Sequence, residues 1–344
     1  MSEKFLSINE AGEIFFDIED APVRKPVFIH EIQQNLKLNE KFLLTTEFQD
    51  ETYIVESFDH PLQIVAIEFK DGKIYLQPAG NNLFIADKDK WCVDAWDRFN
   101  GLTSFGAPFV LTSKAQEQLF DTCDSFDDEG FSAGGHYVAT PPYYIDHPKT
   151  QKPTFWSDIY AGGQPNWDLA APSPVLVDML PRLKLPKSRI LVLGCGEGHD
   201  AALFAEAGHV VTAVDFSKEG LRRGKERYAH LSNLFFHESN IFDLPMDWNN
   251  SFDLVIEHTC FCAIAPDQRT EMVRLWRRML HEQGQLMSVF YIMEKRIGPP
   301  FGVTEWEIRK HLEKHFHFLF WSRWRQSIES RQGRELFVLA KKIK

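Results

Sequence analysis

A glycine-rich turn, Gly194-Cys195-Gly196-Glu197-Gly198, is the part of this sequence whose residue types most directly predict ligand binding. It follows a short apolar run at residues 190–193 and precedes a stretch with helical spacing, which predicts a strand, a turn and a helix. Glycines permit positive φ and allow a ligand to approach the backbone closely, while the first N–H groups of the helix face that ligand. A site for a nucleotide-like ligand is therefore expected, and a tight turn without a ligand is the structural alternative.

The next predicted strand, HVVTAV, ends at Asp215. A carboxylate at this position can accept hydrogen bonds from the two hydroxyls of a ribose, and capping of the following helix is the alternative. The NAD fingerprint requires a third glycine where this chain has His199. Since S-adenosylmethionine has no pyrophosphate, this turn favours S-adenosylmethionine over NAD.

The segments around this turn resemble the thiopurine methyltransferase family, and especially its thiol and halide methyltransferase branch. Upstream, FWSDIYAGGQPNWD has the family's spacing of aromatic residues at Trp156, Tyr160 and Trp167, followed by Asp168. Downstream, NIFDLP, FCAIAPDQR and IGPPF resemble three more family motifs in the same order. The resemblance extends from about Thr154 to the C-terminus and does not include the first 150 residues.

The resemblance and the turn chemistry together imply a set of site residues. S-adenosylmethionine is the expected cofactor, and its expected contacts are Trp156, Tyr160, Trp167, Gly194, Cys195, Gly196, Gly198, Asp215, Phe216, Asn240, Ile241, Phe242 and Glu257. Aromatic faces attract the positively charged sulfonium and exclude water, although core packing is the alternative for the three aromatic residues. The expected substrate-binding residues are Arg269, Pro299, Pro300 and Phe301. Arg269 could equally open the next helix with its charge in solvent.

His258 is the position where the chain departs from the family, which has arginine or often tyrosine there. A histidine can take the proton of a thiol near neutral pH, so His258 is the candidate catalytic base, with a structural role as the alternative. Cys260 and Cys262 supply two metal ligands at most, and buried thiols are the favoured interpretation. No metal site is expected.

The elements that must position these residues fall into two parts. From about residue 5 to 110, short apolar runs with strand spacing predict antiparallel β structure, with a hairpin at Asp71-Gly72 and a helix near residues 114–123. A run rich in glycine and proline follows, so the expected domains are residues 1–145, mostly β and of unknown role, and residues 146–344. In the second domain, strands alternate with helices, which predicts an α/β parallel sheet. The resemblance implies a Rossmann-like sheet of seven strands with an antiparallel last strand, RELFVLAKK.

Composition limits the function further. The 344 residues are 44% hydrophobic and 25% charged, and a net charge of −11 argues against nucleic acid as a partner. Five cysteines without a CxxC pair indicate a reducing, cytoplasmic setting. The sequence has no apolar leader and no long apolar stretch, so no membrane association is expected.

The expected function is transfer of a methyl group from S-adenosylmethionine to a small nucleophile, above all a thiol or sulfide such as hydrogen sulfide or methanethiol. Halides, selenium or tellurium oxyanions and thiopurines are further candidate acceptors. One alternative is a cofactor-binding sensor or scaffold whose N-terminal β domain binds a protein partner or self-associates. An NAD-dependent oxidoreductase is another.

Overall fold

The computed structural model describes residues 3–17, 19–80, 82–144 and 148–343, and the chain forms two compact units. Unit 1 contains residues 1–145 together with the segments 293–296 and 303–307, and unit 2 contains the rest. The expected boundary between residues 145 and 146 lies among residues 145–147, which are outside the described residues. The assignment of two short segments of the C-terminal half to unit 1 was not predicted.

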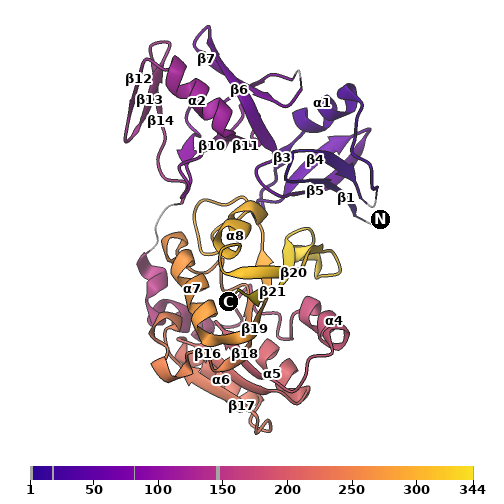
Figure 1. Cartoon of the computed structure of the whole chain (residues 1–344), viewed down its shortest axis with the longest axis vertical. Helices are drawn as coiled ribbons and strands as arrows, with labels where there is room; N and C mark the ends of the chain where they lie inside the picture. The colour runs from indigo at the N-terminus through magenta and orange to yellow at the C-terminus, as the bar shows by residue number, and fades with distance from the viewer. Residues whose placement is uncertain (1–2, 18, 81, 145–147, 344) are drawn as a thin grey trace. The chain divides into compact units, whose positions relative to one another are not determined.

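Within the residues that the structure describes, unit 1 contains three β-sheets and two complete helices (Figure 1). The five-stranded sheet has the order β2 (Ile14–Phe16), β1 (Lys4–Ile8), β5 (Glu51–Ser57), β4 (Leu44–Phe48) and β3 (Lys37–Leu38). The six-stranded sheet has the order β8 (Phe84–Ile85), β7 (Lys73–Pro78), β6 (Leu62–Lys70), β11 (Pro108–Leu111), β10 (Phe99–Leu102) and β9 (Cys92–Val93). The third contains β12 (Ser125–Asp127), β13 (Gly130–Ala133) and β14 (His136–Ala139). The helices are α1 (Pro26–Gln34) and α2 (Ser113–Thr122).

The local predictions for unit 1 are confirmed, whereas the purely antiparallel pairing is wrong. Asp71 and Gly72 have φ of 50° and 69° and join β6 to β7, because these two residue types tolerate positive φ in a tight hairpin. However, β1 pairs with β5 in parallel, and β6 pairs with β11 in parallel. Helix α1 was not predicted, although Pro26 at its start is a typical first-turn residue.

Unit 2 is built on a seven-stranded sheet, and its order is β17 (Leu234–Glu238), β16 (Val210–Asp215), β15 (Arg189–Leu193), β18 (Phe252–His258), β19 (Leu280–Tyr291), β21 (Glu335–Lys342) and β20 (Phe316–Trp324). The strands from β15 to β19 pair in parallel, and β21 is antiparallel to both of its neighbours. The expected Rossmann-like sheet with an antiparallel last strand is therefore confirmed.

Helices cover both faces of this sheet. They are α3 (Pro153–Ala161), α4 (Pro174–Leu183), α5 (His199–Glu206), α6 (Lys218–Arg227), α7 (Arg269–Met279) and α8 (Glu305–Leu312), with short 3-10 turns at Pro148–Gln151, Ile241–Asp243, Met246–Trp248, Pro266–Gln268 and Glu329–Arg331. Apolar side chains of α4 and α5 pack on one face, including Val175 and Phe204 against Val192. On the other face, Trp276 of α7 contacts Phe290 of β19.

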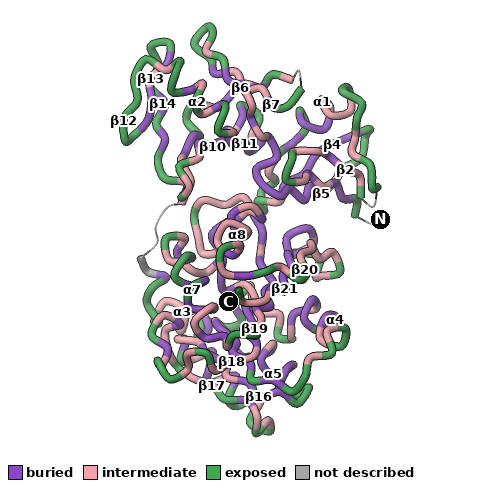
Figure 2. Tube along the Cα trace, viewed as in Figure 1, coloured by how far each residue is buried: buried purple, intermediate pink, exposed green. Residues whose placement is uncertain are grey.

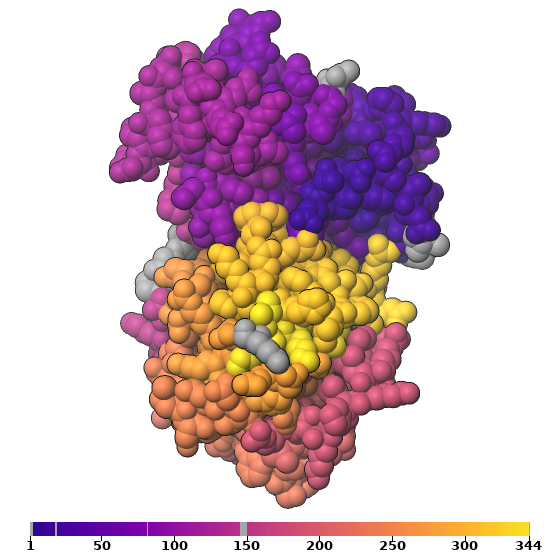
Figure 3. Space-filling model, in the orientation of Figure 1, coloured from indigo at the N-terminus to yellow at the C-terminus, as the bar shows by residue number. Residues whose placement is uncertain are grey.

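Buried residues follow the strands of both units, and exposed residues follow the loops and outer helix faces (Figure 2). The described chain ends at Ile343, whose carbonyl accepts a hydrogen bond from Arg277 of α7. The yellow C-terminal residues are visible on the surface of unit 2 (Figure 3). No helix within the described ranges combines the length and apolarity needed to cross a bilayer. The parallel strands end near the turn after β15, which is where a doubly wound sheet binds its ligands.

Candidate active site

The glycine turn connects β15 to α5 in the way the sequence predicts. Gly194, Gly196 and Gly198 have φ of 62°, 53° and 80°, a region that other residues rarely adopt. A Cβ atom at these positions would collide with the Cys260 thiol, the Tyr160 hydroxyl and the Phe236 ring, respectively. Glycine is therefore required here by backbone conformation and by close packing. Cys195 contributes mainly its backbone, and burial raises the pKa of its thiol well above the usual range.

Asp215 ends β16 and links the next strand to this turn. One carboxylate oxygen accepts a hydrogen bond from the N–H of Gly196 at 2.8 Å, and the other accepts from the N–H of Ser217 at 2.8 Å. Burial raises the pKa of Asp215, while these backbone donors offset part of that effect. The N-cap of α6 is Ser217, whose hydroxyl accepts from the N–H of Gly220, so Asp215 is not the helix cap.

The second strand-end segment expected at the cofactor, Asn240 to Phe242, forms a short 3-10 turn after β17. The Asn240 side chain caps this turn by accepting a hydrogen bond from the N–H of Phe242 at 3.1 Å. Ile241 is buried, and Phe242 is half-buried, as is Phe216 directly after Asp215.

The three predicted aromatic residues come together next to the glycine turn. Trp156 and Tyr160 lie on α3, and Trp167 follows that helix. The ring centroid of Trp167 lies 5.6 Å from that of Trp156 and 6.2 Å from that of Tyr160. Tyr160 accepts a hydrogen bond from the Trp167 indole at 3.3 Å, and burial raises the pKa of its hydroxyl, which therefore stays protonated.

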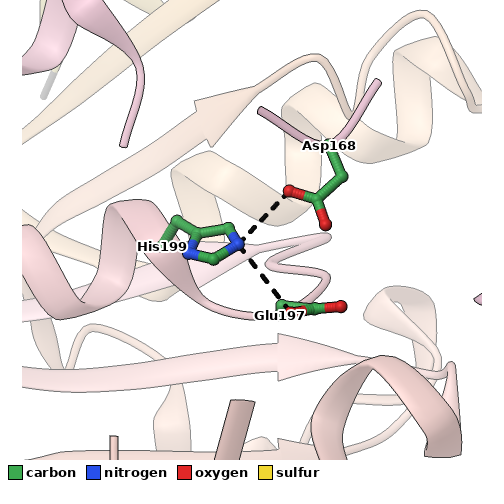
Figure 4. Close-up of side chains that lie close together, drawn as sticks. All are labelled: Asp168, Glu197 and His199. Carbon is green, nitrogen blue, oxygen red and sulfur yellow. Dashed lines mark ion pairs between the residues drawn. The ribbon is translucent and has the colours of Figure 1, made fainter. Parts of the chain in front are cut away.

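A charge network that sequence reasoning did not predict fixes the segment after these aromatics, residues 167–173. His199 Nε2 lies 3.2 Å from Asp168 and 3.9 Å from Glu197 (Figure 4). Burial alone would raise the pKa of Asp168, but its hydrogen bond with His199 outweighs burial and lowers the pKa. Further along, the N–H of Ser173 donates to Asp200 at 2.7 Å. The segment is thus attached to the first turn of α5 and the loop before it.

Asp168, Glu197 and His199 lie close enough together to hold a metal ion, but each already has protein partners. Glu197 pairs with Arg223 and Arg227, each at 3.2 Å. The other ring nitrogen of His199 lies 2.6 Å from the hydroxyl of Tyr228. These contacts explain the cluster as an ion-pair network that attaches the aromatic segment.

His258 is part of a second buried network and is not free to act as the predicted base. Its Nδ1 lies 2.7 Å from Asp200, and its Nε2 lies 2.8 Å from Arg331 Nη1 and 3.9 Å from Glu335. Burial opposes a charged ring, but the carboxylate of Asp200 outweighs burial and raises the pKa of His258 to about 9. A charged ring has no lone pair, and the single lone pair of a neutral ring faces Arg331, a group that can only donate.

Arg331 connects this network to the aromatic segment. Its second nitrogen, Nη2, donates a hydrogen bond to the backbone carbonyl of Trp167 at 2.7 Å, and Nη1 lies 3.3 Å from Glu335. These contacts favour the structural alternative for His258, since the ring and Arg331 together fix the carbonyl next to the aromatic cluster. Nothing in the sequence near Arg331 indicated this contact.

Glu257 lies on the opposite face of β18 from His258 and is fully buried. One of its oxygens accepts a hydrogen bond from the N–H of Phe261 at 2.8 Å, and burial raises the pKa of Glu257 to about 7. Cys260 and Cys262 are also buried, and burial raises the pKa of the Cys262 thiol to about 12. Both thiols are therefore unreactive packing groups, as the favoured interpretation expects.

Of the predicted substrate residues, Pro299, Pro300 and Phe301 lie in one loop, residues 297–302, and Arg269 of α7 contacts this loop. Arg269 is buried, not solvated, stacks on the Phe261 ring at 4.9 Å and donates to the carbonyl of Gly302 at 3.1 Å. Phe301 is fully buried, and its N–H donates to the carbonyl of Cys262 at 2.7 Å. These two residues hold the loop through their contacts with Gly302 and Cys262. Ile297 is exposed, and Gly298, Pro299 and Pro300 are half-buried, so residues 297–300 form the accessible part of the loop.

The residues present fit S-adenosylmethionine. Each oxygen of Asp215 accepts one backbone hydrogen bond, which leaves further lone pairs for ribose hydroxyls. The glycine turn leaves backbone next to this carboxylate free of side-chain bulk. Trp156 and Trp167 supply aromatic faces for a positively charged sulfur.

The comparisons with known proteins point the same way. A family model described as thiopurine S-methyltransferase matches residues 151–337. The probable thiol methyltransferase 2 of Arabidopsis thaliana is 30% identical over 160 residues, which is 46% of this chain and 70% of that protein. The thiocyanate methyltransferase 1 of Brassica oleracea is 30% identical over 163 residues, with the same shares. A solved structure of the Burkholderia thailandensis 1,6-didemethyltoxoflavin-N1-methyltransferase has a TM-score of 0.49 at 20% identity, and the match covers 64% of this chain and 99% of that one.

Proposed function

This chain belongs to the thiopurine S-methyltransferase family, and from that premise we propose that its acceptor is a small thiol or sulfide. The chain is an S-adenosylmethionine-dependent methyltransferase. The sensor and NAD alternatives receive no support from these relatives, which carry the names of methyltransferases.

One observation carries the choice of acceptor: Nδ1 of His258 pairs with Asp200 and Nε2 faces Arg331, so neither ring nitrogen is placed to take a proton from an acceptor. Glu257 is no substitute, because it is fully buried and bonded to a backbone N–H. An acceptor that needs a base, such as an alcohol, is therefore a poor substrate. Hydrogen sulfide ionises appreciably near neutral pH without a base, a thiol does so to a smaller extent, and both react as the anion. The names of the two relatives at 30% identity, a thiol and a thiocyanate methyltransferase, support a sulfur acceptor.

S-adenosylmethionine supplies a methyl group on a positively charged sulfur when it is bound. The chain's own residues then have three tasks. Asp215 and the glycine turn bind the nucleoside, Trp156 and Trp167 attract the positive charge, and the same rings exclude water from the reacting atoms. The half-buried loop at Pro299 and Pro300 limits the size of the acceptor. Holding donor and acceptor in line is the main source of catalysis in such a displacement.

A panel of acceptors tests this proposal. The purified chain is supplied with S-adenosylmethionine and, in turn, sulfide, methanethiol, an aromatic thiol, thiocyanate, iodide and a thiopurine, with an alcohol and an amine as controls. Methylated products are measured by gas chromatography. We expect thiols and sulfide to give the highest kcat/KM. For each of these acceptors, the rate should rise with pH in proportion to the fraction of the acceptor that is ionised. Tight donor binding in calorimetry with no product, or efficient methylation of the alcohol, would contradict the proposal.

A further inference from the structure

The loop at residues 297–302 lies between two short segments of the chain that belong to the other unit. The segments on its two sides, residues 293–296 and 303–307, belong to unit 1, while the loop itself belongs to unit 2. The N–H of Val303 donates to the carbonyl of Met293 at 3.0 Å in an isolated β-bridge, so the two ends of the loop meet at a closed base. This base is part of the unit that contains the N-terminal 145 residues.

The first side of the base is held by a buried ion pair. Glu294 Oε1 lies 3.0 Å from His60 Nδ1, and the other carboxylate oxygen accepts a hydrogen bond from the Tyr143 hydroxyl at 3.1 Å. The His60 and Glu294 side chains are 7% and 14% exposed. Burial alone would lower the pKa of His60, but Glu294 outweighs burial and raises it. Arg296 adds a hydrogen bond to the carbonyl of Tyr143 at 2.8 Å.

The second side of the base is held by Trp306. Its backbone N–H donates to the carbonyl of Phe58 at 2.8 Å, and the guanidinium of Arg98 lies 3.3 Å from the centre of the indole ring. Arg98 is itself fixed by Asp59 at 2.6 Å and Asp94 at 2.7 Å. Both carboxylates outweigh the burial of Arg98 and raise the pKa of its guanidinium, which therefore remains charged. A planar guanidinium held by two carboxylates gives the indole a defined surface on which to stack.

Helix α8 extends this attachment. Its first residues, Glu305 to Glu307, belong to unit 1, and the rest of the helix belongs to unit 2. The Tyr144 hydroxyl donates to Glu307 at 2.6 Å. The position of this first turn also determines where the loop before it ends.

We propose that unit 1 positions the acceptor loop of the methyltransferase, with His60 and Arg98 as positioning residues at the two sides of its base. The proposal rests on the proposed function, since it takes residues 297–302 as the loop next to the acceptor. The cofactor residues Gly196, Asp215 and Trp167 all lie in unit 2, outside these segments. Changes at the base therefore affect acceptor binding and leave donor binding unchanged.

Variants of the full chain test this separation. Arg98→Met removes the charge that holds Trp306, Arg98→Lys keeps the charge without the planar fork, and Glu294→Gln weakens the pair with His60. Lys37→Gln is the matched control, because Lys37 forms an exposed ion pair with Glu47 in the same unit. We expect Arg98→Met and Glu294→Gln to raise the acceptor KM about tenfold, Arg98→Lys to recover part of that loss, and the control to match the parent. Donor Kd from calorimetry should change less than about twofold in every variant.

Amide hydrogen exchange gives a readout that does not depend on catalysis. We expect residues 297–302 to exchange faster in Arg98→Met and Glu294→Gln, with the β15 and β16 amides unchanged. Unchanged loop exchange in both variants would overturn the proposal, as would an equal loss of donor and acceptor affinity. If the parent protein methylates none of the acceptors, the proposed function fails, while the exchange experiment still decides whether unit 1 holds the loop.

Discussion

The buried pair of His258 and Asp200 gives a direct test of how the active site handles protons. The Asp200 carboxylate outweighs burial and raises the pKa of His258 to about 9 against the ordinary 6.5, which corresponds to about 3 kcal/mol in favour of the charged ring. Asp200→Asn keeps the size of the side chain and removes its charge. Burial then dominates, so we expect the pKa of His258 to fall below 6.5 in this variant.

The measurement is an NMR titration of the full chain with histidine labelled at the ring. His258→Gln identifies the resonance, and histidines of unit 1, such as His30 and His136, serve as internal controls. Because the folded pKa is raised, the pair stabilises the protein fully below pH 6.5, and this contribution is lost as the pH rises through about 9. A parent ring that titrates near 6.5, or a titration that Asp200→Asn leaves unchanged, would refute the reasoning.

Three other predictions concern separate parts of the site and chain. Gly196→Ala forces a positive φ on alanine and pushes a methyl group against Tyr160, so calorimetry should show at least about tenfold weaker donor binding. Gly208→Ala is the control: it also has a positive φ but lies in open space, so it should bind the donor normally. Of the five thiols, only Cys123 combines partial exposure with a position outside the buried active-site segments, so a thiol reagent at pH 8 should label one group rapidly and none in Cys123→Ser. Burial raises the pKa of Glu257 to about 7, so the parent protein loses stability as the pH rises from 4.5 to 7. Glu257→Gln does not ionise, so its free energy of unfolding should gain about 3 kcal/mol relative to the parent across that range. Chemical unfolding, followed by a signal from unit 2, measures this difference.

The donor side of the site was predictable because its determinants are local in sequence. Gly194, Gly196 and Gly198 adopt positive φ, and glycine is the residue type that does so readily, so this turn could be predicted from residue type alone. Asp215 follows an apolar strand, and parallel strands place their ends at one edge of a sheet. The aromatic residues of α3 were found only through the family resemblance, since helical spacing alone does not distinguish a cofactor contact from core packing.

The charge networks could not be predicted, because each contact joins residues that are distant in sequence. His258 is suited to proton transfer by residue type, but its function depends on Asp200 and Arg331, which reach it from α5 and from the turn before β21. Arg269 shows the same limit. Its position at a helix start allowed a solvated role, whereas the structure buries it against Phe261. Parallel pairing of β1 with β5 is likewise decided by tertiary packing, since either orientation fits the same alternating pattern.

This difference between local and distant determinants has a consequence for how the enzyme can change. Donor binding depends on residues of unit 2 alone: the glycine turn, the Asp215 carboxylate bonded to it, and the aromatic segment that Arg331 and His199 fix. A substitution in unit 1 is therefore expected to have little effect on it. The acceptor loop depends on Glu294 and Trp306, whose partners are residues such as His60 and Arg98 in the N-terminal part of the chain. Contacts of buried charges are sensitive to the loss of either partner, because the remaining charge keeps its desolvation cost. Substitutions in unit 1 are therefore expected to alter the choice and affinity of the acceptor at constant donor affinity.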